Sequence, residues 1–386
     1  GPRPLLRGPC FDHRDLSAAW LRRMIHFLIA SALALSLSAT PARSTRPSPA
    51  ITPFVGDVAF DEAVHLCECR VAYGTTSMAE VPSLLRKTFD ADFERLLDEN
   101  SDRLVHNITC LQPALDTNGY KKYNQDLLSL PLRRGRVCAN GCCSGACSRT
   151  FWPHLATRNE CEQFRFLSER LMPDAENNPH HNMYLMLCAA AGEVRTTLLF
   201  VRLLERMRRA IAHEYGIPLE QIYPRSAFLS RLYAPGCEEQ TLHSDESSFP
   251  CFHYSVVLYL STQGIEFEGG SIRFFTSPLQ HLGGLGRSEG QDPLAVGVHP
   301  PLEEVAPAIG SALAFSSGWE NPHQVQPLQA GCRHAIPAFF ATKSEAPLPL
   351  EDDAARAEEL WCTVLRPESE DDFRKVWGRW HEILVG

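Results

Sequence analysis

The segment His243-Ser244-Asp245 carries two side chains that bind transition metals. On an extended strand, residues two apart point to the same face, so His243 and Asp245 can reach one ion while Ser244 points away from it. A histidine nitrogen and a carboxylate oxygen are both ligands of non-haem iron(II). The spacing therefore predicts two ligands of one metal site.

A second histidine and an arginine follow in an order that completes such a site. His323 comes directly after Asn321-Pro322, and Arg333 lies ten residues further on. Two histidines and one carboxylate leave three positions open on iron(II), which 2-oxoglutarate and oxygen can fill. The guanidinium of Arg333 can hold a carboxylate with two hydrogen bonds, which suits the far end of 2-oxoglutarate. We expect a turn at 329–331 and a hairpin that returns Arg333 to the metal.

The prediction depends on the ordered set, because the isolated pattern also occurs at His13-Arg14-Asp15. We predict that His243, Asp245 and His323 bind iron(II). Together with Arg333, which binds 2-oxoglutarate, they form the predicted catalytic set. A zinc hydrolase is an alternative, but the sequence contains no His-Glu-x-x-His motif to support it.

The elements around these residues change from helices to short strands along the chain. Helices are predicted at 161–171 and at 196–215, and Gly216 followed by Pro218 ends the second. Short segments rich in β-branched and aromatic residues then predict strands. These segments are 227–233, 254–260, 270–275, 311–315 and 333–340. The pattern predicts an α+β fold, a double-stranded β-helix (jelly roll) with supporting helices. Because Pro337 lies inside the last strand, we expect a bulge or a sheet edge there.

The charge of the chain bears on its partners. A formal net charge of -9 at pH 7 argues against a nucleic-acid partner, because binding to phosphates needs a basic face. Several arginines gather in the segment 202–209. We expect them on the solvent-exposed face of an amphipathic helix.

The N-terminal part of the sequence has the pattern of a secretory signal peptide. Arg22 and Arg23 precede Met24, an apolar run follows, and small residues lie near Ala39 and Ala42. The run is short for a membrane span, although a short membrane anchor remains the alternative. Fourteen cysteines also favour an oxidising compartment. We expect a protein of the secretory pathway, in the endoplasmic reticulum lumen or secreted, with no membrane span beyond the signal segment.

These features divide the chain into five predicted parts. The parts are an upstream extension with the signal peptide at 1–42, a linker at 43–54, a small helical Cys-rich region at 55–147, the oxygenase domain at 148–345, and an acidic helical tail at 346–386. The segment 138–147 contains two Cys-x-x-x-Cys units, which predict disulfides in an oxidising compartment or, as the alternative, a zinc site.

Four stretches of sequence extend the pattern beyond the metal ligands: HSD at 243–245, YSVVLYL at 254–260, FEGGSIRFF at 267–275, and FSSGWENPHQVQPLQAGCRHAI at 315–336. With them, residues 226–345 resemble the catalytic domain of the collagen prolyl 3-hydroxylases, the leprecan family of the prolyl hydroxylase superfamily. The resemblance implies Fe(2+), 2-oxoglutarate, L-ascorbate and an endoplasmic-reticulum setting. It also implies 3-hydroxylation of proline in a polypeptide, with collagen-like chains as one candidate, and release of succinate and CO2.

The resemblance also implies further residues and leaves alternatives open. In the wider superfamily, tyrosines placed like Tyr233 and Tyr259 help to bind 2-oxoglutarate, although a tyrosine in a strand is often part of the core. The region before the domain is much shorter than in the leprecan proteins. A prolyl 4-hydroxylase acting on hydroxyproline-rich secreted proteins, and a non-catalytic matrix-assembly protein of the same fold, are therefore kept as alternatives.

A secretory route predicts the state of the mature chain. We expect the mature N-terminus near residues 40–44 and a glycan on Asn107, which begins an Asn-Ile-Thr acceptor triplet. Several cysteines, some of them in 138–147, are expected in disulfides. N-terminal sequencing, glycosidase digestion and thiol labelling of the protein from eukaryotic cells would test this. A fully reduced protein that retains Met24 would contradict it.

Overall fold

The computed structural model describes residues 55–74, 76–108, 147–172, 180–184, 194–234, 243–245, 252–275, 301–318 and 320–342. The predicted signal peptide and linker, the cysteines of 138–146 and the predicted tail lie outside these residues, as does the side chain of Asn107. The described cysteines Cys67, Cys69, Cys161 and Cys332 are free thiols, so the disulfide prediction stays with the other cysteines.

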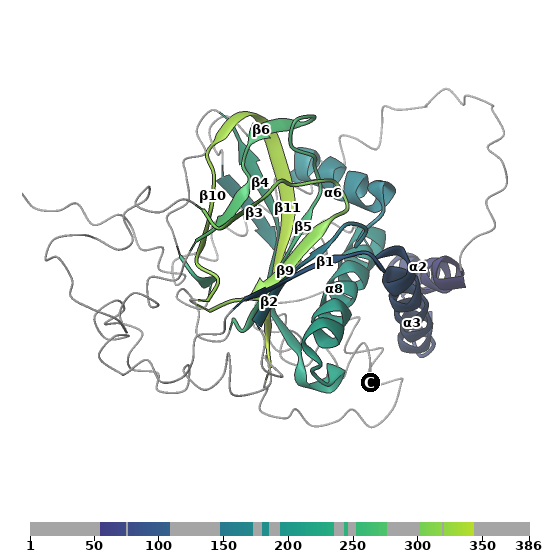
Figure 1. Cartoon of the computed structure of the whole chain (residues 1–386). Coiled ribbons are helices and arrows are strands. Elements are labelled where there is room, and N and C mark those ends of the chain that lie inside the picture. Colours follow the sequence, from purple (N-terminus) through teal and green to yellow (C-terminus); the bar gives the residue numbers. More distant parts are fainter. Residues whose placement is uncertain are drawn as a thin grey trace, which may run out of the picture.

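Two antiparallel sheets form the core of the domain (Figure 1). The larger sheet has the order β1 (Leu104–Ile108), β2 (Cys147–Trp152), β9 (Ala312–Ser316), β5 (Tyr254–Tyr259), β11 (Leu328–Ala341), β4 (Tyr223–Tyr233) and β3 (His180–Tyr184), with β6 (Phe267–Gly269) also paired to β11. The smaller sheet has the order β10 (His323–Val325), β7 (Ile272–Phe274) and β8 (Glu303–Val305).

The chain passes repeatedly from one sheet to the other. It runs from β9 in the larger sheet to β10 in the smaller one and back to β11. The two sheets pack face to face, since the rings of Phe315 on β9 and Phe274 on β7 lie 5.2 Å apart in one buried cluster with Tyr259. The fold is therefore a double-stranded β-helix, as the sequence predicts.

Helices cover the other face of the larger sheet (Figure 1). The helices α6 (Arg158–Leu171) and α8 (Val194–Tyr215) pack on the sheet, and α2 (Val55–Tyr73) and α3 (Val81–Glu99) pack on α8. A short 3-10 helix, η2 (Leu219–Gln221), follows α8. Phe200 and Met207 of α8 share one buried core with Ile336 and Phe340 of β11. The capping box of Thr157 and Glu160 starts α6. Both helices predicted at 161–171 and 196–215 are confirmed.

The five predicted strands are confirmed, and two details of the prediction need correction. β10 does not pair with β11, so the expected hairpin is wrong, and residues 329–331 lie within β11, where they pair with β6. β11 is a central strand rather than an edge, and its pairing with β4 is interrupted at 336–337, which accommodates the missing N–H of Pro337. β1, from the predicted Cys-rich region, pairs with β2, at the start of the predicted oxygenase domain.

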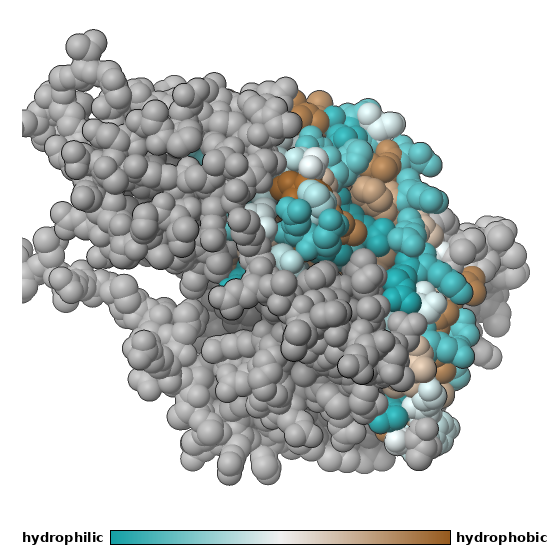
Figure 2. Space-filling view, turned by 90° about the horizontal axis from the view of Figure 1, so that it is seen from below, coloured by the Kyte–Doolittle hydropathy of each residue, from teal (hydrophilic) through white to brown (hydrophobic). Residues whose placement is uncertain are grey.

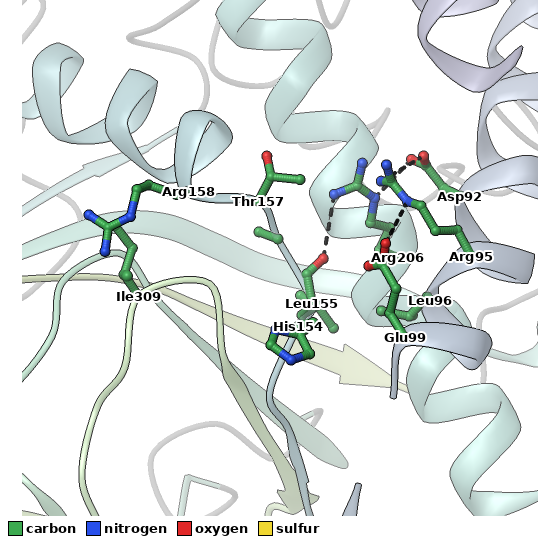
Figure 3. A pocket seen from close by; sticks show the side chains of 11 residues that line it. Asp92, Arg95, Leu96, Glu99, His154, Leu155, Thr157, Arg158, Arg206 and Ile309 are labelled. Carbon is green, nitrogen blue, oxygen red and sulfur yellow. Dashed lines mark hydrogen bonds and ion pairs between the residues drawn. The ribbon is translucent and has the colours of Figure 1, made fainter. Parts of the chain in front are cut away.

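The arginines of the segment 202–209 are buried rather than exposed, so that expectation is wrong. Asp92 on α3 accepts hydrogen bonds from Arg202 at 2.6 Å and from Arg206 at 2.8 Å. Arg206 also donates to Glu160 at the start of α6, at 2.7 Å. Figure 3 shows Asp92 and Arg206 pointing toward each other beside a cleft of about 630 Å³. These ion pairs join three helices, and the cleft lies among them, away from the predicted metal ligands.

On the side seen in Figure 2, the described residues are mainly hydrophilic, with hydrophobic residues scattered among them. Within the described part of the chain, we find no helix with the length and apolar character needed to cross a membrane.

The buried ion pairs predict a large loss of stability when Asp92 is removed. Asp92→Ala leaves two buried guanidinium groups short of a partner, which costs about 3–5 kcal/mol of the free energy of unfolding. Urea unfolding at pH 7 measures this loss. Glu162→Gln, which removes the exposed Arg158–Glu162 pair at 3.6 Å, is the matched control with a change within about 0.5 kcal/mol. Equal midpoints for both variants would contradict the role of Asp92.

The carboxylate of Asp92 also makes this contribution to the free energy of unfolding depend on pH. Burial alone would raise the pKa of Asp92, but Arg206 and Arg202 hold this pKa below its usual value. The stabilisation is therefore complete at neutral pH, begins to decline near the unfolded-state pKa of about 3.9, and is lost as the pH falls through the folded-state pKa. The difference in stability between the native chain and Asp92→Ala should shrink accordingly at acidic pH.

Candidate metal centre

Two histidines from distant parts of the sequence lie side by side at the end of the smaller sheet. His323 begins β10, and His243 forms an isolated antiparallel bridge with it. The His243 N–H donates to the His323 carbonyl oxygen at 3.0 Å, and the His323 N–H donates to the His243 carbonyl oxygen at 2.8 Å. The centroids of the two rings are 4.6 Å apart. These two main-chain hydrogen bonds thus hold the imidazole rings of His243 and His323 next to each other.

The carboxylate of Asp245 faces both rings. Its Oδ1 lies 3.6 Å from Nε2 of His243 and 3.7 Å from Nε2 of His323. One ligand atom from each of the three residues lies within 4.8 Å of the others, which suits a single ion. Burial alone would raise the pKa of Asp245, but the His323 and His243 rings hold this pKa below its usual value, so the group is a carboxylate at neutral pH.

The second oxygen of Asp245 is held by the larger sheet. Ser255 on β5 donates its hydroxyl to Oδ2 at 2.6 Å, and the hydroxyl of Ser317 lies 2.7 Å from that of Ser255. Because Oδ2 is occupied in this way, Oδ1 is the oxygen directed at the histidines. The serines were not predicted from the sequence, since serine is common and a hydrogen bond between strands has no local signature.

The ring of His323 is oriented by its own loop. Its Nδ1 lies 2.9 Å from the main-chain carbonyl oxygen of Asn321, which only accepts, so Nδ1 carries the proton and Nε2 offers a lone pair. Burial lowers the pKa of His323 to about 4, so the imidazole is neutral at physiological pH. Phe315 and Phe274 pack around the ring, with centroids at 5.0 and 5.6 Å. The donor set of two imidazoles and one carboxylate fits iron(II) with open positions.

Arg333 lies on the inner face of the larger sheet, where only 5% of the residue is exposed. Its guanidinium carbon is 5.5 Å from the ring centroid of Tyr259 on β5. Burial raises the pKa of Tyr259 to about 12 against the opposing effect of Arg333, so the phenol stays protonated. A Cβ on Gly270, where φ is +70°, would lie 3.2 Å from Cδ of Arg333 and 2.8 Å from Leu328. Glycine is therefore needed beside Arg333.

In this structure, Tyr233 does not lie on the same face of the sheet as Arg333. Arg333 pairs with Leu232, whereas Tyr233 pairs with Cys332, one residue along each strand. Side chains alternate between faces, so Tyr233 lies on the side of Cys332 and His334 and not on the side of Arg333. The role of Tyr233 in binding 2-oxoglutarate, which the resemblance implies, stays a prediction, and this register gives it no direct support. His334 pairs with Arg231 on the same outer face.

Comparison with known proteins agrees with this donor set. Residues 229–341 match the model of the 2OG-Fe(II) oxygenase superfamily. The chain is 25% identical over 230 residues to 2-oxoglutarate and iron-dependent oxygenase domain-containing protein 3 of Rattus norvegicus, covering 52% of this chain and 65% of that protein. It is 31% identical over 118 residues to prolyl 3-hydroxylase 1 of Homo sapiens, covering 31% of this chain and 13% of that protein.

Solved structures with low likeness were also found. The viral collagen prolyl hydroxylase of Paramecium Bursaria Chlorella virus-1 has a TM-score of 0.34 and 12% identity, and the match covers 51% of this chain and 96% of that chain. A Pseudomonas putida prolyl-4-hydroxylase has a TM-score of 0.34 and 19% identity, covering 51% of this chain and 93% of that chain. Since both TM-scores are below 0.5, the assignment of the fold rests on the strand order described above.

The fold is a jelly roll, and its donor set of two histidines and one aspartate is the kind that binds iron(II) with open positions. More particularly, residues 229–341 match the 2OG-Fe(II) oxygenase superfamily and are distantly similar to prolyl 3-hydroxylase 1 and to the oxygenase domain-containing protein 3. Iron(II) and 2-oxoglutarate are the metal and co-substrate that this domain implies. The chain spans only 65% and 13% of the length of these two relatives.

The position of Arg333 predicts its contribution to the binding of 2-oxoglutarate. Arg333→Lys keeps the charge and loses the planar fork, and Arg333→Ala loses both. A charge-assisted hydrogen bond is worth roughly 1.5–3 kcal/mol, so the Kd for 2-oxoglutarate should rise about ten- to a hundredfold, more for Ala than for Lys. Calorimetric titration with 2-oxoglutarate measures it.

His334→Ala is the matched control, because His334 lies on the opposite face and should leave the Kd for 2-oxoglutarate unchanged. Equal effects at 333 and 334 would mean that the co-substrate binds elsewhere.

Proposed function

We propose that this chain is an Fe(II)- and 2-oxoglutarate-dependent dioxygenase that hydroxylates proline residues of polypeptides, at C3 in preference to C4. The observation that carries the proposal is the convergence of His243, Asp245 and His323 within 4.8 Å. The buried Arg333 beside Tyr259 on the same inner face adds the group that 2-oxoglutarate needs. When bound, the iron and 2-oxoglutarate supply the oxidising chemistry, with succinate and CO2 as co-products.

Each residue of the site has a defined task in this proposal. The rings of His243 and His323 and the carboxylate of Asp245 hold the metal, and Ser255 keeps the carboxylate turned toward it. Arg333 binds the distal carboxylate of 2-oxoglutarate with two hydrogen bonds. The phenyl rings around His323 exclude water, which strengthens the electrostatic interactions within the site.

The choice of substrate is supported by the relatives. Prolyl 3-hydroxylase 1 is 31% identical to this chain over 118 residues, and the segment FSSGWENPH at 315–323 resembles the leprecan pattern. We therefore propose a proline-containing polypeptide as substrate, with collagen-like chains as one candidate. L-ascorbate, the endoplasmic reticulum lumen or secretion, and the absence of a nucleic-acid partner belong to the same proposal and rest on the sequence.

The proposal predicts that each metal ligand is indispensable. His243→Ala, Asp245→Ala and His323→Ala should each abolish succinate release, because each removes one of three protein ligands. Iron content after reconstitution with Fe(2+) should fall in parallel, while urea unfolding shows that the chain stays folded. His65→Ala, at an exposed position on α2, is the control, which should keep both the succinate release and the iron content of the native chain.

The assay itself separates the alternatives. The full-length protein is incubated with Fe(2+), 2-oxoglutarate, L-ascorbate and proline-rich peptides, and the peptides are hydrolysed for amino-acid analysis. 3-Hydroxyproline supports the proposal, 4-hydroxyproline supports a prolyl 4-hydroxylase, and iron binding without succinate release supports a non-catalytic protein. Turnover by any of the three ligand variants would refute the assignment of the metal site.

A further inference from the structure

Arg149 on β2 is a buried cation that the proposed chemistry does not use. Only 4% of the residue is exposed. It pairs with Phe315 of β9, so its side chain lies on the inner face, between the two sheets. Its guanidinium carbon lies 4.2 Å from the ring centroid of Phe274 on β7. A charge buried at this position needs partners that compensate for its loss of water.

The partners of Arg149 come from two different elements. Its Nη1 donates to Oε2 of Glu303 on β8 at 3.0 Å, and its Nε donates to Oδ1 of Asn321 at 2.6 Å. Glu303 belongs to the smaller sheet, and Asn321 belongs to the loop that leads from β9 to β10. Arg149 therefore connects the larger sheet with the smaller sheet and with the loop that enters it.

Both polar atoms of the Asn321 side chain form hydrogen bonds. Its Oδ1 accepts from Arg149, and its Nδ2 donates to the carbonyl oxygen of Ser316 at 2.9 Å and lies 3.0 Å from the hydroxyl of Ser316. The main-chain carbonyl oxygen of the same residue accepts from Nδ1 of His323 at 2.9 Å. The orientation of the His323 ring thus depends on how Asn321 is held.

We propose that Arg149 is a positioning residue for the metal site: it holds Asn321, and Asn321 fixes the ring of His323 with Nε2 directed at Asp245. The inference rests on the proposed function in taking His243, Asp245 and His323 as metal ligands. Outer partners of metal-binding histidines set the tautomer and the ring orientation, and their loss typically lowers metal affinity or activity ten- to a hundredfold. Arg149 makes no contact with a metal ligand that the structure records, and its hydrogen bond to Asn321 is the route by which it positions the ring.

The experiment measures binding of Co(2+) by the full chain, with the visible absorption of the bound ion as the report of its coordination geometry. Arg149→Met keeps the aliphatic contact with Phe274 and removes both hydrogen bonds. We expect the Kd for Co(2+) to rise ten- to a hundredfold and the absorption bands to change. Arg149→Lys keeps the charge but cannot serve both Glu303 and Asn321, so it should lie between the native chain and Arg149→Met.

A double-mutant cycle tests the route through Asn321. Asn321→Ala should weaken Co(2+) binding as Arg149→Met does, and the double variant should be no weaker than Asn321→Ala alone, because Arg149 has then lost the residue through which it acts. Arg273→Met is the matched control. It removes an arginine of β7 whose pair with Glu304 is part-exposed, and it should leave the affinity and the absorption bands unchanged.

The outcomes separate this inference from the proposed function. Native affinity and native bands in Arg149→Met or in Arg149→Lys would overturn the role of Arg149 while leaving the metal site intact. Fully additive losses in the double variant would overturn the route through Asn321. A native chain that binds Co(2+) no more tightly than His323→Ala would overturn the metal site, and the role of Arg149 with it.

Discussion

The paired main-chain hydrogen bonds between His243 and His323 are the constraint on which the site depends. They join two segments that lie far apart in the sequence, and they set the two rings 4.6 Å apart. Closing so long a loop costs conformational entropy, which the local bridge alone cannot offset. The packing of the two sheets offsets this loss of conformational entropy. Their buried cluster includes Phe315 and Phe274, which lie next to the ring of His323.

The site is divided between the two sheets. The smaller sheet and its bridge supply the histidines, whereas the larger sheet supplies Ser255, which orients Asp245, and Arg333. Small changes in the distance between the sheets would therefore alter the metal geometry and the place of the co-substrate together. The buried hydrogen bonds across the gap resist such changes, because leaving a buried polar atom without its partner is costly.

The helix side of the molecule uses buried charge in a comparable way. Asp92 and Glu160 neutralise Arg202 and Arg206, so that α3, α6 and α8 are held by directional contacts as well as by apolar packing. Of these helices, α6 and α8 pack on the outer face of the sheet whose inner face carries Arg333, and α3 packs on α8. The supporting layer is thus fixed in position behind the strand that carries Arg333.

The sequence by itself indicated the proposed chemistry, because the types and order of His243, Asp245, His323 and Arg333 suit iron(II) and a dicarboxylate. Local periodicity also predicted two helices and five strands that the structure contains. The tertiary structure alone decided which sheet each strand joins and which face each side chain occupies. The three-residue strand β10 is too short to show a periodicity of its own. The register between β4 and β11 pairs Tyr233 with Cys332 rather than with Arg333, and a change of one residue in that register would reverse the face of each side chain. The partners that orient the ligands were equally invisible in the sequence, because hydrogen bonds between distant strands depend on register and on the approach of the two sheets, which no local pattern encodes.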